Sequence, residues 1–322
     1  MTRFLATLLA SIALSACASF PEPPPRTVAP QFGEGAFRSV DGAHLGLTVW
    51  RAENPRAVFI AVHGMNDYAN AFALAGEWWA RNAQITTYAY DQRGFGRSPG
   101  RGLWPGADAL RQDLSAAIEA AHAAHPDTPL YVVGHSMGAG VVLSAMGAAS
   151  LDVDGVVLAA PGVWGGANLP LAYRAGANLA AAFAPGKTLT GERAARQSTD
   201  NIEVLRAMQA DPLMIGPTRI DAVLGVVRLM GEAYDASDEA GGAALVLIGE
   251  HDEIIPERAM ARAARRLCGD VETRVYPEGW HLLFRDLQAE TVWRDVAAWI
   301  ERKDAAGAAG GAGPAASSCE VR

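Results

Sequence analysis

Short, continuous runs of apolar residues recur along the central part of the chain, separated by longer segments with helical periodicity. The apolar runs are Ala57–Val62, Ile85–Tyr90, Leu130–Val133, Gly155–Ala159 and Ala244–Ile248. Such runs, rich in β-branched and aromatic residues, are typical of strands covered on both faces of a parallel sheet. The helical patterns are Ala107–Ala124, Gly138–Ala149, Glu257–Leu267 and Gln288–Arg302. This alternation predicts an α/β fold built on an open sheet or a barrel.

Two segments depart from the alternation. Ala36–Arg51 contains an Asp41-Gly42 turn signal, which predicts an antiparallel hairpin ahead of the first parallel strand. From Val163 to about Gly241 the chain is helix-prone and contains no convincing strand, although strand-like runs lie on both sides of it. We therefore expect a helical cap over about residues 163–241, inserted between two strands of the sheet.

The N-terminus has the layout of a secretory signal peptide. Arg3 gives a positive start, and Phe4–Ala16 is an apolar run too short to span a bilayer, so we assign residues 1–16 to the signal peptide. Leu14-Ser15-Ala16-Cys17 resembles the lipobox of bacterial lipoproteins, in which the cysteine becomes the lipidated N-terminus, and we favour lipid attachment at Cys17. Ala16-Cys17-Ala18 also fits an A-x-A cleavage site, which would instead release a soluble protein.

Lipidation of Cys17 predicts a protein anchored to a membrane of the bacterial cell envelope. By lipoprotein analogy, Ala18 rather than Asp after the cysteine favours the outer membrane of a Gram-negative cell. The alternative is a soluble secreted or periplasmic protein. Residues 17–32 are rich in proline, which fixes φ and removes backbone donors, so we expect an extended tether that holds the domain off the membrane.

Low-complexity sequence follows the last helical pattern. Residues 304–322 are rich in Ala, Gly and Ser without periodicity, so we expect a disordered tail and place the folded domain at residues 33–303. Cys319 lies in this tail, and Cys268 lies near the end of a helical pattern. An oxidising compartment would permit a disulfide between them, but nothing in the sequence requires one.

Composition narrows the class of protein. Of 322 residues, 50% are hydrophobic and 19% are charged, which excludes an intrinsically disordered chain. The net charge is −8 without a long Lys/Arg run, so we expect no nucleic-acid partner, because phosphate binding needs a basic surface. The three cysteines form no CxxC, which excludes a zinc ribbon. A sizeable enzyme or binding protein remains, of undetermined oligomeric state.

A candidate nucleophile lies in the motif G-H-S-M-G at Gly134–Gly138. The motif follows a strand-like run and precedes a helical pattern, which is the context of a nucleophile elbow, so Ser136 is the candidate nucleophile. A serine hydroxyl needs a base, and in this arrangement the acid and then the histidine follow the serine along the chain. Of seven histidines, His251 and His281 follow Ser136. His281 comes after the strand-like run Val271–Tyr276, so we predict it to be the base.

The candidate acid lies at the end of the preceding strand, where three carboxylates compete. Gly249-Glu250-His251-Asp252-Glu253 follows the apolar run directly. Asp252 resembles the Asp of a G-x-x-D turn found at this position in α/β-hydrolases, and we predict it to be the acid. We interpret Glu250 and Glu253 as solvated loop charges.

Two backbone N–H groups should stabilise the oxyanion that forms during acyl transfer. We predict that Met137, the residue after the nucleophile, supplies one of them. Met65 should supply the other from the tight loop His63-Gly64-Met65 after the first parallel strand. We interpret His63 as a hydrogen-bonding residue that fixes this loop.

Two weaker signals do not change this interpretation. Gly94–Gly100 is glycine-rich after a strand but lacks the third glycine of a dinucleotide-binding fingerprint, so we expect a bend beside the site. His122 and His125 are three residues apart, but no carboxylate or cysteine completes a set of metal ligands. We therefore predict neither a metal nor a cofactor.

The motifs together resemble one known family. They are H-G-M at 63–65, D-Q-R-G-F-G-R-S at 91–98, G-H-S-M-G at 134–138, D-P-L at 211–213, G-E-H-D at 249–252 and the terminal His281. This set, spread over Ala36–Arg302, resembles the α/β-hydrolases of the monoacylglycerol lipase and lysophospholipase branch. The resemblance implies the α/β-hydrolase fold and a serine hydrolase acting on carboxylic esters, of the monoacylglycerol or lysophospholipid type. Met65 and Asn66-Asp67 depart from the smaller residues that members often carry there.

Other functions remain open on the same residues. A peptidase, thioesterase or perhydrolase would use the same three side chains, and a non-catalytic surface lipoprotein would keep the fold for binding. The complete set of serine, acid and histidine favours an enzyme, because a binding module needs none of the three. In the cap, the helical patterns that open at Asn168–Tyr173 and Ile220–Met230 should wall an apolar acyl pocket above Ser136, with Leu224 and Val227 lining it. The alternative is that these faces only pack the cap onto the sheet.

Overall fold

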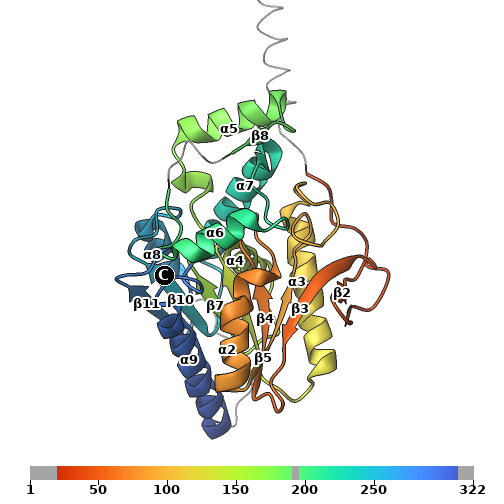
Figure 1. Cartoon of the computed structure of the whole chain (residues 1–322), viewed down its shortest axis with the longest axis vertical. Helices are drawn as coiled ribbons and strands as arrows, with labels where there is room; N and C mark the ends of the chain where they lie inside the picture. Colours follow the sequence, from red (N-terminus) through yellow and green to blue (C-terminus); the bar gives the residue numbers. More distant parts are fainter. Residues whose placement is uncertain (1–19, 191–195, 311–322) are drawn as a thin grey trace, which may run out of the picture.

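A single central sheet organises the molecule, whose computed structural model describes residues 20–190 and 196–310 (Figure 1). Its strand order is β1-β2-β3-β5-β4-β6-β7-β10-β11. All pairs from β5 to β11 are parallel, whereas β1, β2, β3 and β5 pair antiparallel. The bounds are β1 Gln31–Phe32, β2 Ala36–Arg38, β3 His44–Trp50, β4 Ala57–Val62, β5 Ile85–Tyr90, β6 Leu130–His135, β7 Gly155–Ala159, β10 Ala244–Gly249 and β11 Val271–Tyr276.

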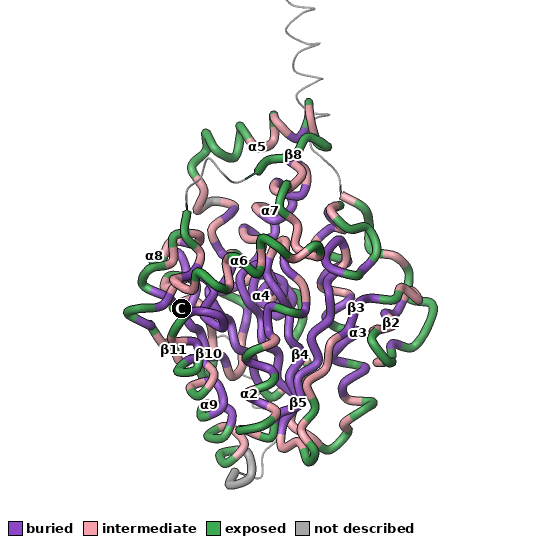
Figure 2. The backbone as a smooth tube through the Cα atoms, in the orientation of Figure 1, coloured by how far each residue is buried: buried purple, intermediate pink, exposed green. Residues whose placement is uncertain are grey.

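Helices cover both faces of the sheet. They are η1 Ala69–Phe72, α2 Ala73–Ala83, α3 Ala107–Ala124, α4 Met137–Ala148, α8 Glu257–Arg266 and α9 Ala289–Gly310. On one face, the rings of Phe59 in β4 and Tyr131 in β6 contact Trp79 of α2 and Trp299 of α9. The helices α3 and α4 pack together on the other face. The central strands are therefore buried along their length, as Figure 2 shows, which is why their sequences are continuous apolar runs.

The observed elements confirm the predicted α/β fold, now as an open sheet rather than a barrel. The strands β4, β5 and β7 have the predicted bounds, while β6 and β10 extend to His135 and Gly249. The predicted hairpin is β2 paired with β3. The helix α2 was not predicted, because only a few of its positions are buried, of which Trp79 is the largest.

Between β7 and β10 the chain forms a set of helices beyond the ends of the central strands (Figure 1). They are η2 Gly166–Asn168, α5 Leu171–Phe183, α6 Ile202–Ala210 and α7 Ile220–Ala236. A two-stranded ribbon, β8 Thr188–Leu189 with β9 Thr218–Arg219, was not predicted. The helix α7 packs against α4 and against α5, so it joins this cap to the helix that follows the candidate nucleophile.

The proline-rich segment lies against the domain from Phe20 onward. Gln112 of α3 donates to the carbonyl of Pro24 (3.0 Å), and Arg26 pairs with Glu119 of α3 (2.7 Å). The amides of Thr27 and Val28 donate to the Val40 carbonyl. This differs from the free spacer that we expected. Prolines lack N–H donors, but their carbonyls and the residues between them still bond to α3. Residues 1–19, including the expected signal peptide and Cys17, lie outside the described residues.

The last helix is longer than predicted. The helix α9 continues past Arg302 to Gly310, so the expected boundary at residue 304 falls inside it. Asp304 accepts hydrogen bonds from Tyr131 (2.7 Å) and Arg56 (3.1 Å), which attaches this part of the helix to β6 and to the chain ahead of β4. Cys319 and the rest of the expected tail lie outside the described residues. Within the described part of the chain, no helix is both long enough and apolar enough to cross a membrane.

Candidate active site

Ser136 lies at a sharp turn between the end of β6 and the start of α4. Its φ of 53° is unusual for a residue with a side chain, and such strain is found at nucleophile elbows. The glycines on either side of Ser136 are required because other backbone atoms lie too close to them to leave room for a Cβ. A Cβ on Gly138 would lie 2.0 Å from the carbonyl oxygen of Val62 in β4, and one on Gly134 would lie 2.7 Å from the amide nitrogen of Ala139. The motif therefore places the serine hydroxyl at the end of the parallel strands.

A hydrogen-bond chain connects Asp252, His281 and Ser136. His281 Nε2 lies 2.9 Å from Ser136 Oγ, and His281 Nδ1 lies 2.8 Å from Asp252 Oδ2. Because an ionised carboxylate can only accept, Nδ1 carries the proton and Nε2 accepts from the serine hydroxyl. Ser136 and His281 are buried, and the side chain of Asp252 is fully buried. The tertiary structure thus brings together three residues that the sequence analysis selected from distant parts of the chain.

The loop after β10 distinguishes Asp252 from its neighbours. The second carboxylate oxygen of Asp252, Oδ1, accepts from the amides of Ile254 and Ile255, both at 2.8 Å. These bonds fix the orientation of the carboxylate and offset the cost of burying it. Glu250 and Glu253 are exposed, and Glu253 accepts from the Gln197 amide (2.7 Å). Asp252 is therefore the carboxylate of this loop that contacts His281.

His135 supports His281 from the serine motif itself. Its Nε2 lies 2.9 Å from the carbonyl oxygen of His281, and the two rings are 5.1 Å apart. Burial, together with the neighbouring His281, lowers the pKa of His135 well below its usual value. His135 is consequently neutral and donates to that carbonyl. No local pattern in the sequence indicates this contact, because it joins residues that are far apart in the chain.

The loop after β4 passes directly against Ser136. A Cβ on Gly64 would lie 3.2 Å from Ser136 Cβ, so only glycine allows this approach without displacement. Met65 follows in the same loop, and Met137 is the first residue of α4, where backbone N–H groups have no acceptor within the helix. Met137 therefore follows Ser136 directly in the chain, and Met65 follows the glycine that packs against Ser136.

His63 fixes this loop, as the sequence analysis proposed. Its Nε2 accepts from the Gln92 amide (2.8 Å), so Nδ1 carries the proton and donates to the Gly64 carbonyl (2.7 Å). The Gln92 side chain returns a bond to the His63 carbonyl (2.7 Å). Burial lowers the pKa of His63, which keeps the ring neutral for this pair of bonds.

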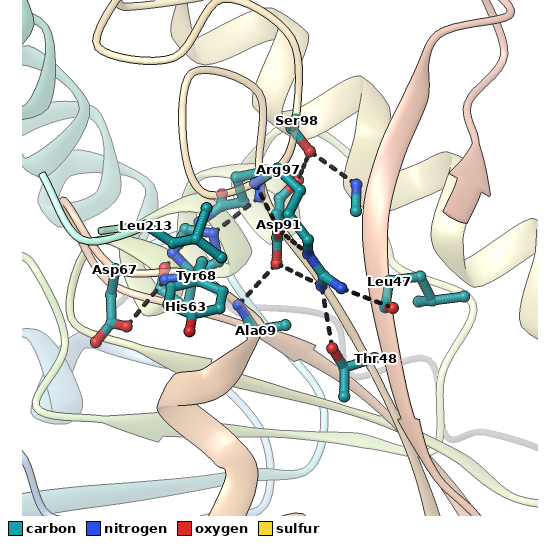
Figure 3. A network of polar contacts seen from close by, with 12 residues as sticks. Leu47, Thr48, His63, Asp67, Tyr68, Ala69, Asp91, Arg97, Ser98 and Leu213 are labelled. Carbon is teal, nitrogen blue, oxygen red and sulfur yellow. Dashed lines mark hydrogen bonds and ion pairs between the residues drawn. The ribbon is translucent and has the colours of Figure 1, made fainter. Parts of the chain in front are cut away.

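The D-Q-R-G-F-G-R-S motif braces the same loop through Asp91 (Figure 3). The buried Asp91 carboxylate accepts from the amide of Ala69 (2.9 Å), and from the amide (2.8 Å) and Nε (2.7 Å) of Arg97. Burial opposes ionisation, but the bonds from Arg97 outweigh it and lower the pKa of Asp91. Arg97 also donates to Thr48 of β3 (3.0 Å). The motif is therefore a structural brace between β3, β5 and the Met65 loop, which agrees with the bend expected there.

Residues 66–68 join the loop to the cap, which the sequence analysis missed. Asn66 Nδ2 donates to Thr218 Oγ1 (2.7 Å), and the Tyr68 hydroxyl donates to Asp211 Oδ2 (2.6 Å). The departures from the family pattern at Asn66-Asp67 thus have partners: Asn66 binds the cap, and Asp67 binds Arg285 in a buried ion pair. Asn66 has a φ of 65°, a conformation that asparagine tolerates better than most residues.

A second set of contacts joins the cap to the loop that carries His281. Backbone atoms of this loop bond to residues that precede α6: the Leu282 amide donates to Ser198 O (2.9 Å), and Asn201 Nδ2 donates to Arg285 O (3.1 Å). Asp286 Oδ2 accepts from the Trp280 amide (2.8 Å), beside His281. Burial raises the pKa of Asp286 to about 6, against the opposing hydrogen bonds from Thr199 and Trp280. The histidine loop is held by the cap as well as by the sheet.

Leu224 and Val227 were predicted to line an acyl pocket. Leu224 is 2% exposed and belongs to a small cluster with Ala181 and Ile220, between α5 and α7, so it packs against the neighbouring cap helix. Val227 is half-buried. The acyl pocket itself stays a prediction.

Two further histidines, His122 and His125, have hydrogen-bond partners outside the candidate site. His122 Nε2 lies 2.8 Å from the carbonyl oxygen of Asp152, and His125 Nε2 lies 2.9 Å from the Tyr88 hydroxyl. Among the residues that the structure describes, no group of three His, Cys, Asp or Glu side chains is placed to hold a metal ion.

A mostly parallel sheet with a serine at the elbow between β6 and α4 is the arrangement of the α/β-hydrolases. Residues 53–288 match the family described as serine aminopeptidase, S33, and the chain belongs to that family. It is 29% identical over 274 residues to a monoacylglycerol lipase of Mycolicibacterium smegmatis, covering 83% of this chain and 96% of that protein. It is 23% identical to a monoglyceride lipase of Mus musculus, covering 84% of this chain and 91% of that protein.

Solved structures share the fold. A monoglyceride lipase from Saccharomyces cerevisiae, a soluble variant in complex with a substrate analogue, superposes with a TM-score of 0.72 and 20% identity, covering 89% of this chain and 99% of that one. A monoacylglycerol lipase from Paleococcus ferrophilus gives a TM-score of 0.69 and 21% identity, covering 80% and 99%. The predicted resemblance to the monoacylglycerol lipase branch is confirmed, and the chain is a carboxylic-ester hydrolase.

Proposed function

We propose that this chain cleaves the ester bond of monoacylglycerols, or of lysophospholipids, through an acyl-enzyme formed on Ser136. The observation that carries the proposal is the hydrogen-bond chain from Asp252 through His281 to Ser136. The relatives named monoacylglycerol lipase and monoglyceride lipase support the choice of substrate class. The non-catalytic alternative gains no support from a strained, buried serine that is hydrogen-bonded to a histidine.

In the first step, Ser136 Oγ attacks the ester carbonyl carbon while its proton passes to His281 Nε2. The imidazolium that forms is stabilised by the Asp252 carboxylate at Nδ1, and the amides of Ile254 and Ile255, which donate to the other carboxylate oxygen, hold that carboxylate in position. The negative charge moves to the former carbonyl oxygen, where the N–H groups of Met65 and Met137 would donate to it.

The intermediate then collapses as His281 returns the proton to the leaving glycerol oxygen. A water molecule repeats the sequence on the acyl-enzyme: His281 removes its proton, and the fatty acid leaves Ser136 Oγ, which regains a proton. The neutral His135 beside His281 fits this cycle, because a second cation there would disfavour the imidazolium.

Labelling with a fluorophosphonate probe tests the nucleophile, and an ester panel tests the substrate. We expect the probe to modify Ser136, and kcat/KM to rise from acetyl to octanoyl esters at a matched leaving group and then to favour monoacylglycerols. An aminoacyl anilide in the same panel measures peptidase activity. Failure to label Ser136 would overturn the mechanism, whereas a preference for acetyl over octanoyl esters would leave a small-ester esterase.

We also propose that Cys17 carries the lipid anchor of an envelope lipoprotein, in the outer membrane if the cell is Gram-negative. The support is the L-S-A-C sequence and the apolar run before it. Two or more acyl chains anchor a protein stably, whereas one binds only marginally. Cys17→Ser should therefore move the protein from the membrane fraction to the soluble fraction. A mature N-terminus at Ser19 by mass spectrometry would favour the A-x-A site and a soluble protein.

A further inference from the structure

The peptide that carries the Met65 N–H is held through its own carbonyl group. Gly64 O, at the other side of this planar peptide, accepts from His63 Nδ1 (2.7 Å) and from the Asp67 amide (3.4 Å). The C=O and N–H of a trans peptide point in opposite directions, so holding Gly64 O toward the His63 ring turns the Met65 N–H away from it. The direction of this predicted oxyanion donor is therefore set by the turn in which it lies.

Asn66 sets the conformation of that turn. Residues 64–67 form a four-residue turn closed by the bond from the Asp67 amide to Gly64 O, and Asn66 occupies its third position with a φ of 65°. A positive φ at the third position is what a type II turn requires. Glycine adopts this φ at no steric cost, so the turn alone does not account for the asparagine side chain.

The cap holds Asn66 by both its side chain and its backbone. Asn66 Nδ2 donates to Thr218 Oγ1 (2.7 Å), and the Asn66 carbonyl accepts from the Ile215 amide (3.1 Å). Two residues further on, the Tyr68 hydroxyl donates to Asp211 Oδ2 (2.6 Å). Three hydrogen bonds thus connect residues 66–68 to the 211–218 segment of the cap, and two of them converge on the residue that follows Met65.

The 211–218 segment is itself fixed from other directions. Arg101, in the loop after β5, donates to the Met214 carbonyl (3.1 Å). Thr218 belongs to β9, where it pairs with Leu189 of β8. A partner that is held independently can orient Asn66, whereas a partner without other bonds would only follow it.

We propose that Asn66 is a positioning residue through which the cap orients the Met65 N–H toward the oxyanion. The inference rests on the proposed function, since an oxyanion forms only when Ser136 attacks an ester. A cap that only walls a substrate pocket contributes to ground-state binding and so to KM. A cap that orients an oxyanion donor contributes to transition-state stabilisation and so to kcat.

The variants Thr218→Val and Thr218→Ser test this contact from the cap side, in the full-length chain. Valine removes the hydroxyl that accepts from Asn66, whereas serine keeps it. In Thr218→Val we expect kcat for a p-nitrophenyl ester to fall by about two- to tenfold, the range that one hydrogen bond allows, with KM unchanged. Thr218→Ser should restore kcat. Thr188→Val makes the same change at an exposed position of β8 and should hydrolyse the ester as the parent does.

The variant Asn66→Gly tests the same bond from the loop side. Glycine keeps the positive φ of the turn without strain, so the turn remains while the bond to Thr218 is lost. We expect kcat to fall about as far as in Thr218→Val. The double variant Asn66→Gly/Thr218→Val should fall no further, because both changes remove one and the same bond.

A transition-state analogue separates orientation of the donor from general damage. Ser136 Oγ adds to the carbonyl carbon of an alkyl trifluoromethyl ketone, the π electron pair moves to the ketone oxygen as an oxyanion, and the serine proton passes to His281 Nε2. Because the adduct needs the oxyanion donors, its inhibition constant should rise by the factor by which kcat/KM falls. An ether analogue of the ester, which forms no oxyanion, should inhibit the parent and the variants equally.

The possible failures are distinguishable. Equal kcat in Thr218→Val, Asn66→Gly and the parent would overturn the positioning role and leave the proposed function intact. A rise in KM alone, or equal weakening of the ketone and the ether, would place the contact in substrate binding and would also overturn that role. A parent that hydrolyses no ester would overturn the proposed function, and the positioning role with it.

Discussion

Asp67 and Arg285 form a buried ion pair that joins the loop after β4 to the loop that carries His281. The first loop contains Met65, and the second is also bonded to the cap through the Arg285 carbonyl. The pair therefore connects the oxyanion side of the candidate site to its histidine side. Neither residue belongs to a motif, and their contact spans most of the length of the hydrolase domain.

Removing one partner of this pair should be strongly destabilising. Arg285→Met leaves the Asp67 carboxylate buried and unpaired, and we expect the free energy of unfolding to fall by about 3–5 kcal/mol in urea denaturation. The double variant Asp67→Leu/Arg285→Met should recover much of that loss. Arg81→Met, which breaks the exposed pair with Glu77, is the control and should cost less than about 1 kcal/mol. A loss in Arg285→Met no larger than in the control would contradict the importance of the pair.

Ser136→Ala should abolish ester hydrolysis without unfolding the protein. The hydroxyl bonds to His281, so we expect kcat to fall by about 10³-fold or more, while the loss of one oxygen atom should leave the melting temperature close to that of the parent. Ser144→Ala removes a hydroxyl from the same helix, α4, and should keep near-parental activity. Retention of a tenth of the activity in Ser136→Ala would remove the serine from the mechanism.

Asp252→Asn should cost nearly as much as loss of the serine. The amide nitrogen can donate to His281 Nδ1, which would favour the wrong tautomer of the imidazole. The same change in other Ser-His-Asp triads lowers kcat by about 10⁴-fold, and we expect a loss of that order here. Glu250→Gln and Glu253→Gln, in the same loop, should change kcat only mildly because both carboxylates are exposed. If either Glu variant is more impaired than Asp252→Asn, the acid has been assigned to the wrong residue.

The buried carboxyl of Asp286 should make stability depend on pH. Burial raises its pKa from 3.8 to about 6 in the folded protein, so the folded state holds the proton more tightly than the unfolded chain does. Its contribution to the free energy of unfolding is therefore highest below pH 4 and is lost as the pH rises through 6. A shift of about two pKa units corresponds to about 3 kcal/mol.

Asp286→Asn removes this titration but keeps an oxygen that accepts from the Trp280 amide. In urea denaturation, the stability of the variant relative to the parent should improve by up to about 3 kcal/mol between pH 4 and pH 7. Because the two proteins share all other titratable groups, the difference between their free energies of unfolding cancels those titrations. A difference that does not change with pH would show that Asp286 titrates normally.

The sequence by itself determined the strands of the parallel sheet and the three candidate catalytic residues. Ala57–Val62 and its equivalents are buried on both faces, so their composition alone identifies them as strands of a parallel sheet. Ser136 was recognisable because an elbow needs glycines where backbone approaches backbone, as Gly138 shows against Val62. His281 and Asp252 followed from chain order, since each comes directly after a strand and the ends of parallel strands meet at one edge.

Only the tertiary structure decided which residues support that site. Asp67 with Arg285, Asn66 with Thr218, and His135 with the His281 carbonyl are single contacts between distant segments, and no local pattern encodes them. The same holds for Phe20, which composition placed in a free spacer but which packs on the cap. Periodicity reports how much of a residue is buried, whereas the identity of its partner depends on how loops of unrelated sequence are brought together by the sheet.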